Sequence, residues 1–199
     1  MIDATILILR ENIRRPYDSM LTFEYDTYVV FDMPSADWTQ RVLDLRRKYD
    51  PDRSELPIEI TVIGSSGVGV FELDQNPTHA FALLDQLAAK LAPITFALET
   101  VERFPGTNLF YLATSAVEKF RAVQTQIVAT GLRFKDSPFP FTPHCTIASL
   151  RADDLAQGEP EIRAFPLPIA EITLDEMRVY SLNQLDCQLL FQTRLRGRS

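Results

Sequence analysis

Two short stretches of the sequence place a hydroxyl two residues after an ionisable group. The stretch PFTPHCTIASLR contains His144 and Thr146. The stretch LPIEITVIGSSG contains Glu59 and Thr61 at the same spacing. In an extended strand, residues i and i+2 project from one face, so the two side chains of each pair point the same way. A hydroxyl can donate a hydrogen bond to a phosphate oxygen while its neighbour transfers a proton. Two such pairs facing each other across a cleft predict acid–base chemistry on a phosphodiester.

The segments that must position these pairs alternate between helical and strand patterns. Runs rich in β-branched and aromatic residues, several with alternating polarity, predict strands. They cover residues 27–33, 56–64, 94–104, 108–114, 144–150, 170–182 and 187–196. Apolar residues at helical spacing predict three helices, which follow Pro34-Ser35, start at Asn76-Pro77 and span residues 115–130. The Pro- and Phe-rich residues 135–143 read as a loop, and the polar residues 151–161 as a surface connection.

This order of elements predicts an α+β fold with mainly antiparallel pairing. A pseudo-repeat is visible in it, because each half carries a helix followed by a strand that holds one of the two polar pairs. We expect a single domain over residues 27–199, made of two pseudo-symmetric lobes. Residues 1–26 mix charged and aromatic residues around Pro16 and are interpreted as an N-terminal extension packed on that domain.

Composition restricts the classes of partner. The net charge of −7 argues against general coating of nucleic acid, which depends on neutralising many phosphates, but it allows a small phosphate ligand. Two cysteines and two histidines offer neither a disulfide framework nor a recognisable metal-binding spacing, so we expect no metal ion and no cofactor. The apolar run ATILIL is too short for a membrane span, and a reduced, cytoplasmic protein without a membrane partner is expected.

At these motifs the sequence resembles the 2H phosphoesterases, which include 2'-5' RNA ligase-like proteins and cyclic phosphodiesterases. Their mark is two H-x-T/S motifs on strands of two pseudo-symmetric lobes around a central cleft. PHCTIASLR matches the second motif, PIEITVIG matches the first, and TYVVFDMP and VERFPGTNLFYLAT add to a resemblance over roughly residues 27–196. It implies a bilobal fold in which two antiparallel sheets flank the cleft, with helices outside. It also implies an RNA ligase-like or phosphodiesterase (hydrolase) activity on 2',3'-cyclic or 2'-5' phosphodiesters of a nucleotide or RNA end.

Glu59 departs from the family pattern, because the first motif would have histidine there. His144, Thr146 and Thr61 match the motifs, which implies an acid or base role for His144 and phosphate binding for the two threonines. A carboxylate can replace the missing base, with protonated His144 as the acid, if the environment separates their pKa values. The opposing argument is charge, since a carboxylate at 4 Å repels a phosphodiester by about 1 kcal/mol in bulk water and by more in a cleft. A catalytically inactive protein that binds a nucleotide or a protein partner is therefore the alternative.

Three further residues near the second motif are candidates for substrate contact. Arg151 follows the motif strand and is a candidate phosphate ligand, although a surface arginine is common at such a place. Phe139 and Phe141 precede the motif and are candidates for stacking on a base, although loop aromatics usually pack on the core. Cys145 alternates with His144 and is expected to point into the core, which excludes it as a nucleophile.

Overall fold

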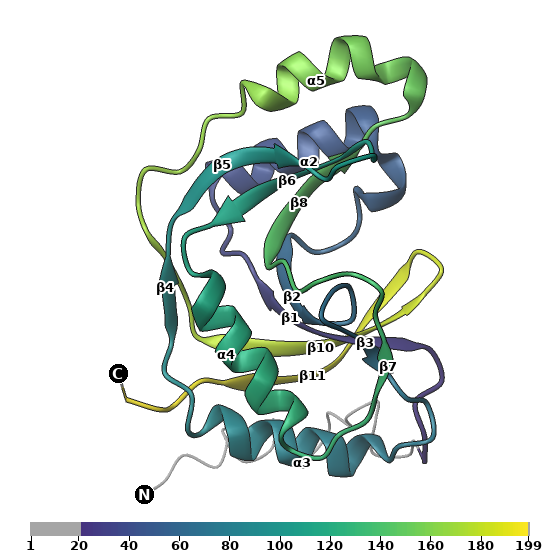
Figure 1. The fold of residues 1–199 in the computed structure, drawn as a ribbon, viewed down its shortest axis with the longest axis vertical. Coiled ribbons are helices and arrows are strands. Elements are labelled where there is room, and N and C mark those ends of the chain that lie inside the picture. The colour runs from purple at the N-terminus through teal and green to yellow at the C-terminus, as the bar shows by residue number, and fades with distance from the viewer. Residues whose placement is uncertain (1–20, 199) are drawn as a thin grey trace, which may run out of the picture.

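The computed structural model describes residues 21–198, and its centre is a seven-stranded antiparallel sheet (Figure 1). The strand order is β11-β10-β1-β2-β8-β6-β5. On one side lie β1 (Asp26–Asp32), β2 (Glu59–Ile63), β10 (Glu176–Asn183) and β11 (Asp186–Arg194). On the other lie β5 (Leu98–Arg103), β6 (Leu109–Thr114) and β8 (His144–Ser149). The prediction of an α+β fold with antiparallel pairing is confirmed.

The two groups of strands join at one residue pair, Ile60 of β2 and Cys145 of β8. The expectation of two separate sheets is therefore wrong in this respect, because the two motif strands hydrogen-bond to each other and make one sheet. Two small sheets complete the fold. They pair β3 (Val68–Phe71) with β7 (Phe134–Asp136), and β4 (Ile94–Phe96) with β9 (Ile172–Leu174).

Within residues 21–198, three of the four α-helices match the sequence prediction. They are α2 (Asp37–Tyr49), α3 (Pro77–Ala88) and α4 (Val117–Val128). Asn76 caps α3 as its position before proline predicts, since its side-chain oxygen accepts from the backbone N–H of His79 at 3.0 Å. Helix α2 packs against β8, and α4 packs against β2. Each of these helices therefore supports the motif strand of the other half of the chain.

The structure differs from the sequence prediction at several places, among them the strand β3, which the sequence did not predict. Residues expected to form a surface connection instead form α5 (Leu155–Arg163), in which Ile162 is buried and Tyr49 donates to Glu161 at 2.5 Å. Gly158 allows this packing, because a Cβ there would lie 2.4 Å from a methyl carbon of Leu150. The start of the predicted 135–143 loop belongs to β7, and two predicted long strands are each divided, at Ala97 and at Asp175.

One face of the central sheet is the apolar core, packed by the helices. Ile60, Cys145, Ile147, Phe31 and Leu112 are fully buried there. Of the expected N-terminal extension, residues 1–20 lie outside the described residues. Just after them, Phe23 is buried, with its ring 5.0 Å from that of Phe71. The opposite face of the sheet carries the polar pairs.

Candidate functional site

The two polar pairs meet at the joint of the central sheet. Because β2 and β8 are antiparallel and pair at Ile60 and Cys145, the register places Thr61 beside His144 and Glu59 beside Thr146. All four side chains project from the face opposite Ile60 and Cys145, and all four are partly exposed. The structure therefore brings together the four residues that the motif spacing singled out.

The neighbouring strands extend this polar face on both sides. Asp32 of β1 is the cross-strand partner of Glu59, and Tyr111 of β6 is the partner of Thr146. The sequence interpretation missed both residues as parts of the site. Their alternation within predicted strands marks the face on which they lie, but only the pairing register shows that they flank the motifs.

His144 is fixed through one ring nitrogen. Its Nδ1 lies 2.7 Å from the carbonyl oxygen of Thr142, and since a carbonyl only accepts, Nδ1 carries the proton and Nε2 is the acceptor in the neutral ring. The rings of Phe104 and Tyr111 pack edge-on against it, with centroids 4.9 and 5.2 Å away. Burial lowers the pKa of His144, although the hydrogen bond to Thr142 acts in the opposite direction. At neutral pH the imidazole is therefore mainly uncharged and can accept a proton at Nε2.

Glu59 is held by its own motif partner. The hydroxyl of Thr61 lies 2.9 Å from each of the two carboxylate oxygens. Burial, with the nearby charge of Asp32, raises the pKa of Glu59 to about 7, while the Thr61 hydrogen bond and Arg46 oppose the rise. Glu59 is therefore substantially protonated at neutral pH. This removes much of the charge repulsion expected between a carboxylate and a phosphodiester.

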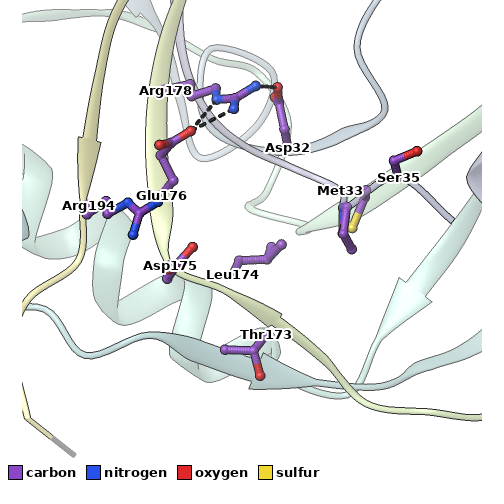
Figure 2. A pocket seen from close by; sticks show the side chains of 10 residues that line it. Asp32, Met33, Ser35, Thr173, Leu174, Asp175, Glu176, Arg178 and Arg194 are labelled. Carbon is purple, nitrogen blue, oxygen red and sulfur yellow. Dashed lines mark hydrogen bonds and ion pairs between the residues drawn. The ribbon is translucent and has the colours of Figure 1, made fainter.

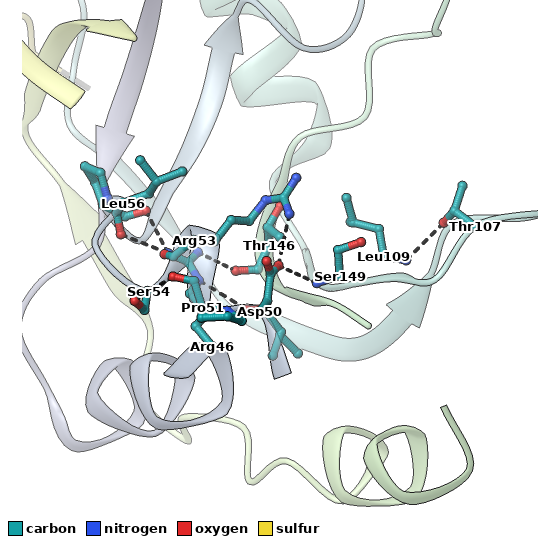
Figure 3. Close-up of polar contacts among 12 residues, drawn as sticks. Arg46, Asp50, Pro51, Arg53, Ser54, Leu56, Thr107, Leu109, Thr146 and Ser149 are labelled. Atoms are coloured by element: carbon teal, nitrogen blue, oxygen red, sulfur yellow. Dashed lines mark hydrogen bonds and ion pairs between the residues drawn. The ribbon is translucent and has the colours of Figure 1, made fainter. Parts of the chain in front are cut away.

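Arg46, on the helix that packs against β8, fixes the backbone of the second motif (Figure 3). The residue is buried on α2, and no acidic side chain pairs with it within residues 21–198. Its guanidinium donates at 2.8–3.3 Å to five main-chain carbonyls, those of Thr146, Ile147, Arg53, Leu56 and Pro57. It thus ties β8 to the segment that leads into β2. The sequence signal that was missed is its helical spacing from Val42 and Tyr49, which places an arginine on the apolar face of the helix.

Gln124 has the corresponding place under the first motif. This buried side chain on α4 donates to the carbonyls of Val62 and Ser66, at 2.8 and 3.0 Å. Gly67 follows with a positive φ of 76°, and a Cβ there would lie 2.4 Å from Gln124 Oε1, so only glycine fits. The end of β2 is therefore fixed by a helix of the other half, as β8 is.

The loops at the His144 end of the two motif strands are bonded to each other. Gly67 donates to the carbonyl of Phe139 at 2.9 Å, and Thr142 donates to the hydroxyl of Ser66 at 3.1 Å. The ring of Phe139 is 65% exposed on this rim, where it can meet a ligand. Phe141 is buried, with the Arg121 guanidinium 5.7 Å from its ring centroid, so it offers no open face for base stacking.

The other predicted residues lie apart from this centre. Arg151 is exposed after the far end of β8, five residues beyond Thr146, or roughly 16 Å of extended chain. The structure therefore does not bring Arg151 to the paired motifs. Cys145 is fully buried, and burial raises the pKa of its thiol to about 12, which agrees with its predicted place in the core.

A cavity of about 500 Å³ lies beside Asp32, the cross-strand partner of Glu59 (Figure 2). Asp32 lines it together with Glu176, Arg178 and Arg194. Figure 2 shows Arg178 reaching Asp32 on one side and Glu176 on the other, and both ion pairs are short. Charged groups of both signs therefore lie directly beside the candidate site.

Residues 21–198 contain no group of three or more His, Cys, Asp and Glu side chains arranged to hold a metal ion. None of the helices in the same range combines the length and the apolar composition that a membrane crossing requires. What the centre of the sheet offers is an imidazole, a protonatable carboxyl and two hydroxyls. These groups can transfer protons and bind anions.

Comparison with known proteins identifies the family and supports the fold. A model described as the 2'-5' RNA ligase superfamily matches residues 33–185, which is more than half of the 199-residue chain. The protein TT0787 of Thermus thermophilus has a similar structure with a TM-score of 0.59 and 18% identity, over 87% of this chain and all of that one. No curated protein sequence gives a significant match.

Escherichia coli LigT is also similar in structure. Its complex with NADP+ gives a TM-score of 0.54 and 16% identity, over 87% of this chain and 98% of that one. Its complex with 3'-AMP gives 0.52 and 16%, over 86% and 98%. At these identities the likeness shows the fold.

Proposed function

Because the chain belongs to the 2'-5' RNA ligase superfamily, we propose that it is a phosphodiesterase for 2',3'-cyclic or 2'-5' phosphodiesters of a nucleotide or RNA end. The observation that carries this proposal is the single backbone pair between Ile60 and Cys145. That pair places an imidazole, a carboxyl and two hydroxyls together on one face of the sheet. The LigT complexes with 3'-AMP and NADP+ show that a protein of this fold binds nucleotides.

The protonation states favour Glu59 as the acid and His144 as the base. This reverses the roles that the sequence suggested for a carboxylate beside a histidine. Nε2 of His144 takes a proton from a water molecule while the oxygen of that water attacks phosphorus. Glu59 gives its proton to the oxygen that leaves phosphorus, so one P–O bond forms while another breaks. The pKa of His144 lies below its ordinary value and that of Glu59 near 7, so the required pair of states is the major one between these two values.

The hydroxyls have different parts in this proposal. Thr146 Oγ1 makes no hydrogen bond within residues 21–198, so it is free to donate to a phosphate oxygen. Thr61 orients Glu59 in the structure and would contact phosphate after turning away from it. Phe139 on the rim is the candidate surface for stacking a base. Arg151 remains a candidate only for a substrate long enough to reach the far end of β8.

Phosphorus NMR of 2',3'-cyclic nucleotides and of a 2'-5' dinucleotide tests the proposal. The wild-type protein is expected to convert at least one of them, and His144→Ala and Glu59→Gln to lose roughly 10²- to 10⁴-fold in rate. His79→Ala is the matched control, because this second histidine is exposed on α3 and its side chain lies outside the site. Turnover that is equal in all four proteins would exclude the paired motifs as the source of activity.

A binding protein without catalysis is the second candidate, and Glu59 is the observation that favours it. A protonated carboxyl can hydrogen-bond a phosphate oxygen and hold a nucleotide without completing the reaction. In that case the same titrations would show shifted or broadened phosphorus signals without product, and the shift would disappear in His144→Ala.

A further inference from the structure

Asp32, at the end of β1, has one carboxylate oxygen with two donors and one with none. Its Oδ2 accepts from the Tyr180 hydroxyl at 2.7 Å and from a guanidinium nitrogen of Arg178. Its Oδ1 is buried and has no hydrogen-bond partner within residues 21–198. Buried oxygens are almost always paired, so this one requires a donor.

Glu59, the cross-strand partner of Asp32, also has fewer hydrogen-bond donors than its oxygens can accept from. Asp32 and Glu59 are cross-strand partners in the antiparallel β1–β2 pair, where opposite Cβ atoms are typically about 4.5–5.5 Å apart. Thr61 lies within hydrogen-bond distance of both Glu59 oxygens, but a hydroxyl has one proton and serves one oxygen at a time. Two neighbouring carboxyl groups thus have more acceptors than donors, and a proton between them satisfies both.

We propose that Asp32 is a positioning residue for Glu59, and that Glu59 donates its proton to Oδ1 of Asp32 so that the two carboxyl groups share it. Arg178 and Tyr180 hold the other Asp32 oxygen, which leaves Oδ1 as the oxygen available to Glu59. Figure 2 shows the contact between Arg178 and Asp32. Tyr180 remains a donor over the neutral range, because burial raises the pKa of its hydroxyl.

Within residues 21–198, Asp32 is the negatively charged group that acts on Glu59, because the other titratable groups around Glu59 are uncharged or positive. Tyr28 on β1, Cys145 on β8 and Cys187 on β11 all interact with Glu59, and burial raises the pKa of each, so they are uncharged at neutral pH. Arg46 on α2 is the cation that favours ionised Glu59, but its protons are given to main-chain carbonyls. His144, beside Thr61, is mainly uncharged as well.

A shared proton also bears on the reaction, in a part of the inference that rests on the proposed function. When Glu59 passes its proton to the leaving oxygen, two adjacent carboxylates remain, and their repulsion favours the return of a proton from solvent. Asp32 would thus keep the acid loaded between turnovers without touching the substrate.

Carbon-13 NMR of the glutamate side-chain carboxyl tests the proposal in the full-length protein without any substrate. Glu59 is identified by the resonance missing in Glu59→Gln, and its chemical shift is followed against pH. We expect wild-type Glu59 to titrate near pH 7 and its pKa to fall by roughly one to two units in Asp32→Asn. In Tyr180→Phe the pKa should rise, because Asp32 then lacks one donor and holds the shared proton more strongly.

Asp26→Asn is the matched control, because this aspartate lies on the same strand, is exposed and pairs with Lys135 at 2.9 Å. It should leave the titration of Glu59 unchanged. The proposal is overturned if Glu59 titrates at the same pH in Asp32→Asn as in the wild type, since burial alone would then set its pKa. The carbon-13 titration uses no substrate, so its result does not depend on turnover. A failure to find turnover by phosphorus NMR would therefore count only against the proposed function.

Discussion

The backbone of each motif strand is held by a buried side chain from a helix, but the two strands differ in the hydrogen bonds of their motif side chains. On β2, the Thr61 hydroxyl is bound to the carboxyl group of Glu59, so these two side chains are engaged with each other. On β8, His144 is fixed only through Nδ1, and the Thr146 hydroxyl has no partner within residues 21–198. The β8 pair therefore has groups available to a ligand, whereas the Glu59 carboxyl of the β2 pair has a pKa raised to about 7. In the proposed reaction, this difference assigns the acid role to Glu59 and the base role to His144.

The backbone support is reciprocal between the halves of the chain. Arg46, before the first motif, holds β8, and Gln124, before the second motif, holds the end of β2. Each strand is thus fixed by a helix from the other half, and the two halves cannot separate without breaking these buried hydrogen bonds. Strands β2 and β8 are joined through the single register pair of Ile60 and Cys145. A buried helix side chain binds the backbone of each strand beside this pair.

Removing both catalytic candidates together is expected to have the largest effect. Glu59→Gln and His144→Ala should each lower turnover by roughly 10²- to 10⁴-fold. The double variant should be little worse than the more damaging single variant, because acid and base act in one step and their effects are not additive. Single-turnover rates of the three variants measure this. Losses that multiply would mean that the two strands work independently.

The next largest effect is expected from breaking the backbone support under β8. Arg46→Met leaves five main-chain carbonyls without their donor, and because each buried acceptor left unsatisfied costs about 1–3 kcal/mol, the free energy of unfolding should fall by roughly 3–5 kcal/mol or more. Gln124→Leu removes two hydrogen bonds under β2 and should cost about 1–3 kcal/mol. Urea unfolding of both variants compares the two supports.

Arg47 provides the control for this comparison. It neighbours Arg46 on α2, but its side chain is 54% exposed and pairs with Asp44 on the surface. Arg47→Met should change the free energy of unfolding by less than about 1 kcal/mol. A loss as large as that of Arg46→Met would show that charge, and not the buried hydrogen bonds, stabilises this helix.

The opposite pKa shifts on the two strands predict opposite effects of pH on stability. The folded-state pKa of Glu59 is raised from 4.5 to about 7, so between these values the folded protein holds a proton that the unfolded chain has lost. The free energy of unfolding therefore falls as pH rises through this window, by at most about 3 kcal/mol. The lowered pKa of His144 has the reverse sign, with stability lost as pH falls below 6.5.

Glu59→Gln should therefore be more stable than the wild type at pH 8 and about equal to it at pH 4. Thermal unfolding at the two pH values measures the change. His144→Gln should instead be more stable than the wild type at acid pH. A Glu59→Gln variant that is stabilised equally at both pH values would show that the pKa of Glu59 is not raised in the folded protein.

The sequence predicted the strands that carry the motifs because alternation and spacing are local properties. It placed Glu59 with Thr61, and His144 with Thr146, each on a common face. The register that brings the pairs together is set between Ile60 and Cys145, far apart in the chain, and no local pattern contains it. Asp32 was missed for the same reason. Arg46 has a local signal in its place on the apolar face of the helix, but its partners include carbonyls about a hundred residues away, which the sequence does not reveal. The helix α5 was missed because it contains glycine and proline, which are unfavourable within helices. Its glycine, Gly158, packs against Leu150 and Tyr49, and this contact is not visible in the sequence.

The smallest predicted effects distinguish the two threonines, which look equivalent in the sequence. Thr61→Val removes the hydrogen bond that favours ionised Glu59, so the pKa of Glu59 should rise and the alkaline limb of the pH–rate profile should move to higher pH. Thr146→Val breaks no hydrogen bond within residues 21–198, so the profile should keep its position while KM rises roughly 5- to 10-fold through loss of a phosphate contact. Steady-state kinetics across pH 5 to 9 separates the two results. If both variants instead raise KM and leave the profile in place, the hydroxyls are equivalent phosphate ligands, and the proton of Glu59 is set without Thr61.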